Sequence, residues 1–101
     1  MQTFGLNYQV KPECVDDFKG ALVQLIETMK SYEGHVETKL FVDVTQANSM
    51  MIYSDWKTKA EFATFYRSEA FQKALNDTIG MLESHPTHMA GQDLRLIKNP
   101  G

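Results

Sequence analysis

The sequence predicts an α+β domain in which a four-stranded antiparallel sheet carries helices on one face. Three observations predict it: strand-like alternation near the N-terminus, a helical apolar stripe directly after it, and two helix-capping signals after a predicted hairpin. With 101 residues, of which 43% are apolar and 23% charged, the chain has the size and composition of one globular domain over residues 1–101.

The first strand is predicted over residues 3–10, where apolar and polar side chains alternate. Pro12 then begins a helix, because the N–H that proline lacks needs no partner in a first turn. The helix should end around Ser31, since Gly34 can adopt the positive φ found just past a helix C-terminus. One face of the strand carries Phe4, Leu6, Tyr8 and Val10. The apolar stripe of the helix consists of Val15, Phe18, Leu22, Leu25, Ile26 and Met29.

A hairpin is predicted next, with strands over residues 36–44 and 49–56 joined by the polar turn 45–48. In the first of these strands, Val36, Leu40 and Val42 share one face, and Glu37, Lys39 and Phe41 share the other.

Two helices should follow the hairpin. Thr58 and Glu61 form a capping box, in which each side chain is expected to accept a hydrogen bond from an N–H of the first turn. Ser68 is a second cap, and Pro86 then favours a loop over residues 84–88 before a last strand over 89–97. The stripe expected to be buried after Ser68 is Ala70, Phe71, Ala74, Leu75 and Ile79.

The resulting order, β-α-β-β-α-β, is the ferredoxin-like arrangement, with an antiparallel sheet and helices on one face. The other face of the sheet would stay open. Gly5, Phe41, Met51 and Tyr53 would make that face too apolar to remain wet. We therefore expect a homodimer in which two open faces pack together as a dimeric α/β barrel.

Composition argues against several classes of function. A net charge of −3 and a pI near 5.5 give no basic surface for nucleic acid. No apolar run approaches the roughly 20 residues that span a membrane, and residues 1–4 lack a secretory pattern. The single cysteine, Cys14, excludes an intrachain disulfide and is expected to be inert. We expect a cytoplasmic protein.

The chain resembles the antibiotic biosynthesis monooxygenase (ABM) family of dimeric α+β barrels over nearly its whole length. Four segments carry the resemblance: YQVKPE at 8–13, YEGH at 32–35, YSDWKT at 53–58 and FATFYRSEAF at 62–71. They indicate the fold strongly and the chemistry weakly, because one fold hosts many functions.

The resemblance implies a monooxygenase that needs no cofactor and acts on an electron-rich aromatic or quinol. The family also includes haem-degrading enzymes, whose sites use an asparagine, a tryptophan and a histidine. Asn7 matches the first, but Phe65 and Leu75 stand where the other two would be, so haem degradation is not expected. Many quinol-oxidising members carry a histidine at the position of Phe65, so that acid/base group is missing too.

Asn7 and Trp56 are the candidate catalytic residues. Asn7 could donate a hydrogen bond to a substrate oxygen, or it could be a polar residue facing solvent or an interface. Trp56 could stack on an aromatic substrate, or it could pack in the core between sheet and helices. The candidate substrate-binding residues are Met51, Tyr53, Phe62, Phe65, Tyr66 and His85.

The histidines do not suggest a metal site. His85 and His88 flank Pro86 without a third ligand at a suitable spacing, and His35 is expected at the surface. The sequence thus favours a small, cofactor-independent monooxygenase without metal, binding a small apolar aromatic ligand. The alternative is a non-catalytic ligand-binding or stress-related dimer with the same fold.

Overall fold

The computed structural model describes residues 1–84 and 86–90 of the chain. The predicted order β-α-β-β-α-β is confirmed, with the second helical region divided into two helices. The elements are β1 (Gln2–Gln9), η1 (Pro12–Cys14), α1 (Val15–Lys30), β2 (His35–Asp43), β3 (Gln46–Trp56), α2 (Lys59–Tyr66), α3 (Glu69–Thr78), η2 (Ile79–Met81) and β4 (Thr87–Ala90).

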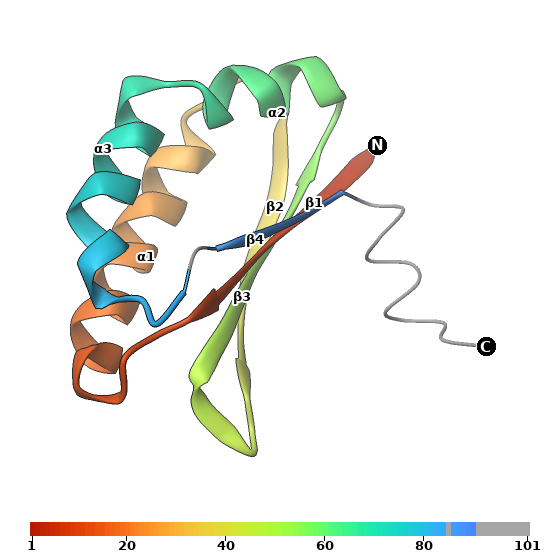
Figure 1. Ribbon diagram of the computed structural model, residues 1–101. Coiled ribbons are helices and arrows are strands. Elements are labelled where there is room, and N and C mark those ends of the chain that lie inside the picture. Colours follow the sequence, from red (N-terminus) through yellow and green to blue (C-terminus); the bar gives the residue numbers. More distant parts are fainter. Residues whose placement is uncertain (85, 91–101) are drawn as a thin grey trace.

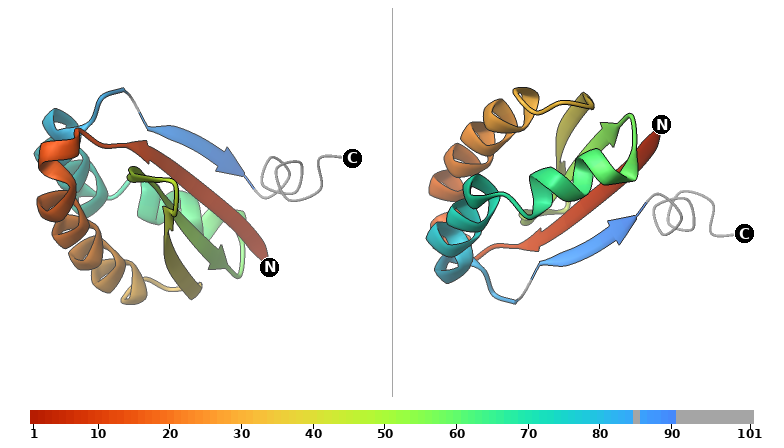
Figure 2. Two further views of the ribbon diagram at one scale, coloured as in Figure 1. Left: turned by 90° about the horizontal axis from the view of Figure 1, so that it is seen from below. Right: turned by 90° about the horizontal axis from the view of Figure 1, so that it is seen from above.

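The strands form one antiparallel sheet in the order β2-β3-β1-β4, and the helices cover one of its faces (Figures 1 and 2). The ferredoxin-like fold is therefore confirmed, and we call the two sides of the sheet the helix face and the open face. Strand β4 begins at Thr87, two residues before the predicted start, and residues 91–97 of the expected strand lie outside the described residues.

The core lies between the helix face of the sheet and helices α1, α2 and α3. Strand β1 contributes Phe4, Leu6 and Tyr8 to it, and Val10 follows just after the strand, all less than 5% exposed. The alternation predicted for this strand is thus confirmed, because each apolar residue points toward the helices. From the predicted stripe of α1, Phe18, Leu22, Leu25 and Met29 are buried, while Val15 and Ile26 pack partly buried against the core.

The hairpin between β2 and β3 turns earlier than predicted. The turn falls at residues 44 and 45, and β3 begins at Gln46, within the segment expected to be the turn. The side chain of Asp43 accounts for this, since its Oδ1 accepts hydrogen bonds from the N–H and the hydroxyl of Thr45, at 2.8 and 2.7 Å. Such a carboxylate-to-backbone bond closes a short turn, and beside it Asp43 pairs with Gln46 after a register shift between Val42 and Asp43.

Two residues at the start of β2 lie elsewhere than predicted, where the register of the strand shifts. The strand pairs His35 with Trp56 but Glu37 with Asp55, so Val36 is an extra residue and is 47% exposed instead of facing the core. His35 is half-buried rather than on the surface, with its ring edge-on to Trp56 at 5.3 Å.

Both predicted helix caps are present. The hydroxyls of Thr58 and Ser68 accept hydrogen bonds from the N–H groups of Glu61 and Phe71, at 3.2 and 3.1 Å. The carboxylate of Glu61, expected to accept from a backbone N–H, accepts instead from the Thr58 hydroxyl at 3.0 Å. The end of α3 also differs, because Thr78 is buried and Ile79 is 38% exposed.

Candidate functional site

An apolar pocket of about 150 Å³ lies on the helix face, between β1 and α3. The only polar side-chain groups among its described lining residues are the hydroxyls of Tyr8 and Tyr66. Apolar walls with a few polar groups are typical of small-molecule sites. The lining residues are Leu6, Tyr8, Tyr66, Phe71, Leu75, Ile79 and Pro86.

Local sequence patterns position these side chains. The alternation of β1 directs Leu6 and Tyr8 toward the helices. The Ser68 cap ends one helix and starts the next, so that Tyr66 at the end of α2 meets Phe71 in the first turns of α3, with ring centroids 4.8 Å apart. Leu75 follows Phe71 by one helical turn and therefore shares its face.

Tyr8 is the buried polar group of this pocket. Its side chain is 4% exposed, and its ring packs edge-on against Phe18 at 5.0 Å. Burial, and then the nearby Tyr66 hydroxyl, raise the pKa of the Tyr8 hydroxyl well above its ordinary value. Tyr8 therefore stays protonated near neutral pH and can donate a hydrogen bond to a ligand.

Trp56 lies in the closed core, outside this pocket. It is fully buried, and its indole N–H donates to the buried Ser54 hydroxyl at 3.0 Å. Phe62 and Phe65 pack on its ring at centroid distances of 5.8 and 5.6 Å. The faces and the donor of the indole are thus occupied by the protein itself, as in the alternative of core packing.

Asn7 lies on the open face, opposite the helices. It pairs with Met51 across β1 and β3, between neighbours whose side chains point into the core. Tyr53 lies on the same open face, where its ring contacts Phe41 at 6.1 Å. The pocket expected to combine Asn7 and Met51 with Trp56 and Phe65 is therefore not formed within this chain, because the sheet separates the two pairs.

Of the predicted site residues, Tyr66 lines the pocket, and His85 lies outside the described residues although its neighbour Pro86 also lines it. Sequence reasoning missed the role of Tyr8. A tyrosine within an otherwise aliphatic and phenylalanine stripe was the available signal, since a buried hydroxyl needs a polar partner. The other lining residues it missed were Leu6, Phe71, Leu75, Ile79 and Pro86.

Within residues 1–84 and 86–90, no group of three or more histidine, cysteine, aspartate or glutamate side chains is arranged to hold a metal ion. In the same part of the chain, no helix has the length and apolar character that crossing a membrane requires.

Comparison with known proteins confirms the resemblance. A family model described as "Antibiotic biosynthesis monooxygenase" matches residues 1–77. The "Putative heme-binding protein" of Natronomonas pharaonis is 32% identical over 87 residues, which are 86% of this chain. This chain spans only 14% of that curated relative.

Solved structures show the same fold. A conserved protein from Methanosarcina mazei Go1 superposes with a TM-score of 0.83 at 20% identity, over 88% of each chain. An antibiotic biosynthesis monooxygenase superposes with a TM-score of 0.82 at 18% identity, over 89% of this chain and 95% of the other.

Proposed function

We propose that this chain, which belongs to the antibiotic biosynthesis monooxygenase family, binds a one-ring, electron-rich aromatic beside Tyr8 and oxidises it without a cofactor. The observation that carries the proposal is the pairing of two phenol hydroxyls, Tyr8 and Tyr66, with an otherwise apolar pocket of about 150 Å³. An apolar cavity of about 150 Å³ is large enough to bind benzene. A hydroquinone or catechol is of this size and offers an oxygen to the Tyr8 hydroxyl.

The chain would act by binding and orienting the ring. Leu6, Phe71 and Leu75 hold the ring in hydrocarbon and exclude water, which strengthens each remaining polar contact. The protonated Tyr8 hydroxyl donates to a substrate oxygen and so stabilises the phenolate form. That anion is the electron donor to O₂ in this chemistry.

The proposed reaction balances without another reductant. Hydroquinone and O₂ give hydroxybenzoquinone and one water, so the substrate supplies all the electrons that reduce O₂. One oxygen atom forms a new C–O bond on the ring, and the displaced ring hydrogen and the quinol hydrogens leave in the water and the new hydroxyl.

The proposal includes a two-fold homodimer through the open face. Phe41 is 51% exposed there and contacts Tyr53, and Met51 lies beside them in register. Apolar side chains gathered on one sheet face favour burial against a second copy. Sedimentation equilibrium should give a dimer for the wild type and a monomer for Phe41→Asp, and a wild-type monomer at micromolar concentration would contradict it.

Haem is a second candidate ligand only because the curated relatives carry that name. The described lining does not fit it. Haem has four pyrrole rings and would need several times the present volume. Among the described lining residues, only the phenol oxygens of Tyr8 and Tyr66 could approach an iron, and the raised pKa of Tyr8 disfavours the tyrosinate form that ligates.

The test is oxygen uptake with hydroquinone and methylhydroquinone, in the presence of a metal chelator and without added flavin. We expect a saturable rate above spontaneous oxidation, and one ¹⁸O atom per product molecule when ¹⁸O₂ is used. A rate equal to the uncatalysed one would contradict the proposal. If phenol still binds in that case, the alternative of a non-catalytic ligand-binding protein is favoured, whereas a one-to-one hemin titration would favour a haem protein.

A further inference from the structure

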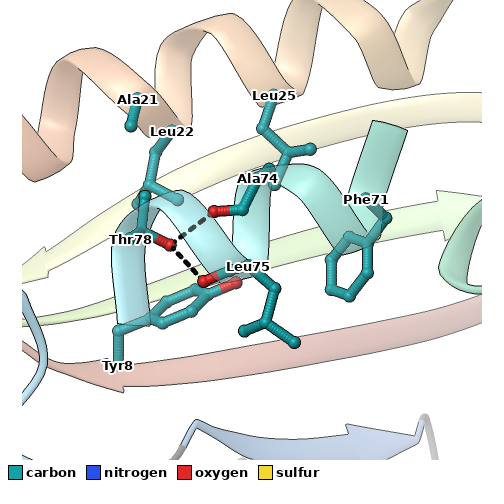
Figure 3. A pocket seen from close by; sticks show the side chains of 8 residues that line it. All are labelled: Tyr8, Ala21, Leu22, Leu25, Phe71, Ala74, Leu75 and Thr78. Atoms are coloured by element: carbon teal, nitrogen blue, oxygen red, sulfur yellow. Dashed lines mark hydrogen bonds between the residues drawn. The ribbon is translucent and has the colours of Figure 1, made fainter. Parts of the chain in front are cut away.

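A second, much smaller cavity lies behind the pocket, between α1 and α3 above β1 (Figure 3). Its volume is about 10 Å³, room for about one water molecule. It is lined by Tyr8, Ala21, Leu22, Leu25, Phe71, Ala74, Leu75 and Thr78. Tyr8, Phe71 and Leu75 line both spaces and thus form the wall between them.

Two of these three wall residues are held in place by ring contacts. Tyr8 packs edge-on against Phe18, and Phe71 stacks on Tyr66 and also contacts Phe65 at 5.4 Å. Leu75 is half-buried and has an aliphatic side chain that projects from α3 toward β1, between Tyr8 and Phe71 as seen in Figure 3. Leu75 is therefore the part of the wall that a substitution can remove at the lowest cost.

The lining beyond Leu75 is mostly hydrocarbon, although the space itself holds only about one water molecule. Ala21 and Ala74 present only methyl groups to this space. The Thr78 hydroxyl donates to the carbonyl oxygen of Ala74 at 2.7 Å, as Figure 3 shows, so this polar group is already satisfied. A second aromatic ring that took the place of the Leu75 side chain would meet this lining and would need no hydrogen bond from the protein.

We infer that Leu75 is the specificity-determining residue of the pocket, restricting it to one-ring ligands by separating it from the cavity between α1 and α3. The substrate class rests on the proposed function, whereas the size limit rests on the two cavities alone. Removing the three outer carbons of Leu75 would join the two spaces, and the volume vacated by those carbons would admit the second ring of a fused two-ring ligand.

The test measures binding rather than turnover, with phenol and 2-naphthol as probes in isothermal titrations. We expect the wild type to bind phenol at least about tenfold more tightly than 2-naphthol, and Leu75→Ala to shift that ratio toward 2-naphthol by about tenfold or more. Ile79→Ala is the matched control, because Ile79 lines the pocket at its exposed rim and does not touch the second cavity.

Three results would overturn the inference: equal affinity of the wild type for both probes, an unchanged ratio in Leu75→Ala, or an equal shift in Ile79→Ala. Should Leu75→Ala fail to fold, Leu75→Val must shift the ratio in the same direction by a smaller factor. Oxygen uptake with hydroquinone separates the two proposals. If Leu75→Ala shifts the affinity ratio but hydroquinone is not turned over, the size limit stands and the proposed oxidation is wrong. If hydroquinone is turned over but the ratio does not shift, the oxidation stands and the size limit is wrong.

Discussion

The two ends of the layer between sheet and helices use similar residues but pack them differently. At one end, Trp56, Phe62 and Phe65 form an aromatic cluster with Phe4 and Tyr32, whose ring pairs lie 3.9 to 5.8 Å apart. At the other end, Tyr8, Tyr66 and Phe71 enclose the pocket of about 150 Å³. The aromatic cluster is closed, and the pocket is not.

The difference shows that aromatic content alone does not distinguish a core from a site. Phe62 and Phe65 meet the large side chain of Trp56 across the layer, so no space remains. Leu6 and Tyr8 meet the half-buried Leu75 and the partly exposed Ile79, which do not fill the space above them. The size of the side chains that face a row of aromatic residues therefore decides whether the space between them is filled, as in a core, or left open as a pocket.

The largest expected effect comes from opening the closed end. Trp56→Ala should lower the free energy of unfolding by about 3–5 kcal/mol, because it empties a fully buried position. Ile79→Ala at the pocket rim should cost less than about 1.5 kcal/mol, since this side chain is 38% exposed. Urea denaturation measures both. Similar losses in the two variants would mean that the two ends are equally packed.

Replacing one glycine at each end of the layer compares how well the two ends tolerate an added side chain. Gly34 has φ +89°, and a Cβ at this position would overlap the Glu61 carboxylate, so Gly34→Ala should cost about 1–3 kcal/mol. Gly80, near the pocket, has open space around it, and Gly80→Ala should change stability by less than about 0.5 kcal/mol. Thermal unfolding of both variants checks this, and an equal loss at Gly80 would show a packing that the open space does not indicate.

The pH dependence of stability tests the burial of Tyr8. Its pKa lies above the ordinary value of 10.0, because of burial and then of Tyr66. Above pH 10 the Tyr8 hydroxyl loses its proton in the unfolded chain but keeps it in the folded chain. The free energy of unfolding therefore falls as pH rises through this range. One such group contributes a slope of about 1.4 kcal/mol per pH unit.

Tyr8→Phe should therefore reduce the loss of stability between about pH 8 and about pH 11, measured by urea denaturation. Equal losses in the wild type and Tyr8→Phe would mean that the hydroxyl titrates as freely as in the unfolded chain, and that the pocket does not bury it.

The smallest effect is expected on the open face. Asn7→Ala should change the Kd for phenol by less than about twofold, because the sheet separates Asn7 from the pocket. Isothermal titration with phenol measures this, and the sedimentation of the variant shows whether the side chain matters to the dimer instead. If Asn7→Ala lost phenol affinity while remaining dimeric, Asn7 would have to contribute to ligand binding.

Sequence periodicity predicted most of the fold. Three kinds of local signal could be predicted from a few residues each, because they depend on neighbours in the sequence. They are the alternation in β1, the apolar stripe of α1, and the helix caps Thr58 and Ser68. The extra residue at Val36 and the early turn at Asp43 could not be predicted in this way, since both depend on pairing with β3.

The site was harder to predict, for a physical reason. A pocket is space that side chains leave unfilled, and no residue type encodes it. The assignment of Asn7 to a pocket with Trp56 also set aside the two-residue period of β1, in which Asn7 must face away from Leu6 and Tyr8. The same period, applied strictly, would have selected Tyr8.

The complete burial of Trp56 has a consequence for its fluorescence. Trp56 is the only tryptophan in the sequence, and it is fully buried at the closed end among Phe62, Phe65 and the His35 ring. Its emission therefore reports the melting of the aromatic cluster and should resist quenching by iodide, which cannot reach a fully buried indole. Tyr8 and Tyr66 lie at the other end of the layer, but Tyr32 and Tyr53 also emit, so the single tryptophan is the specific optical signal of an intact core.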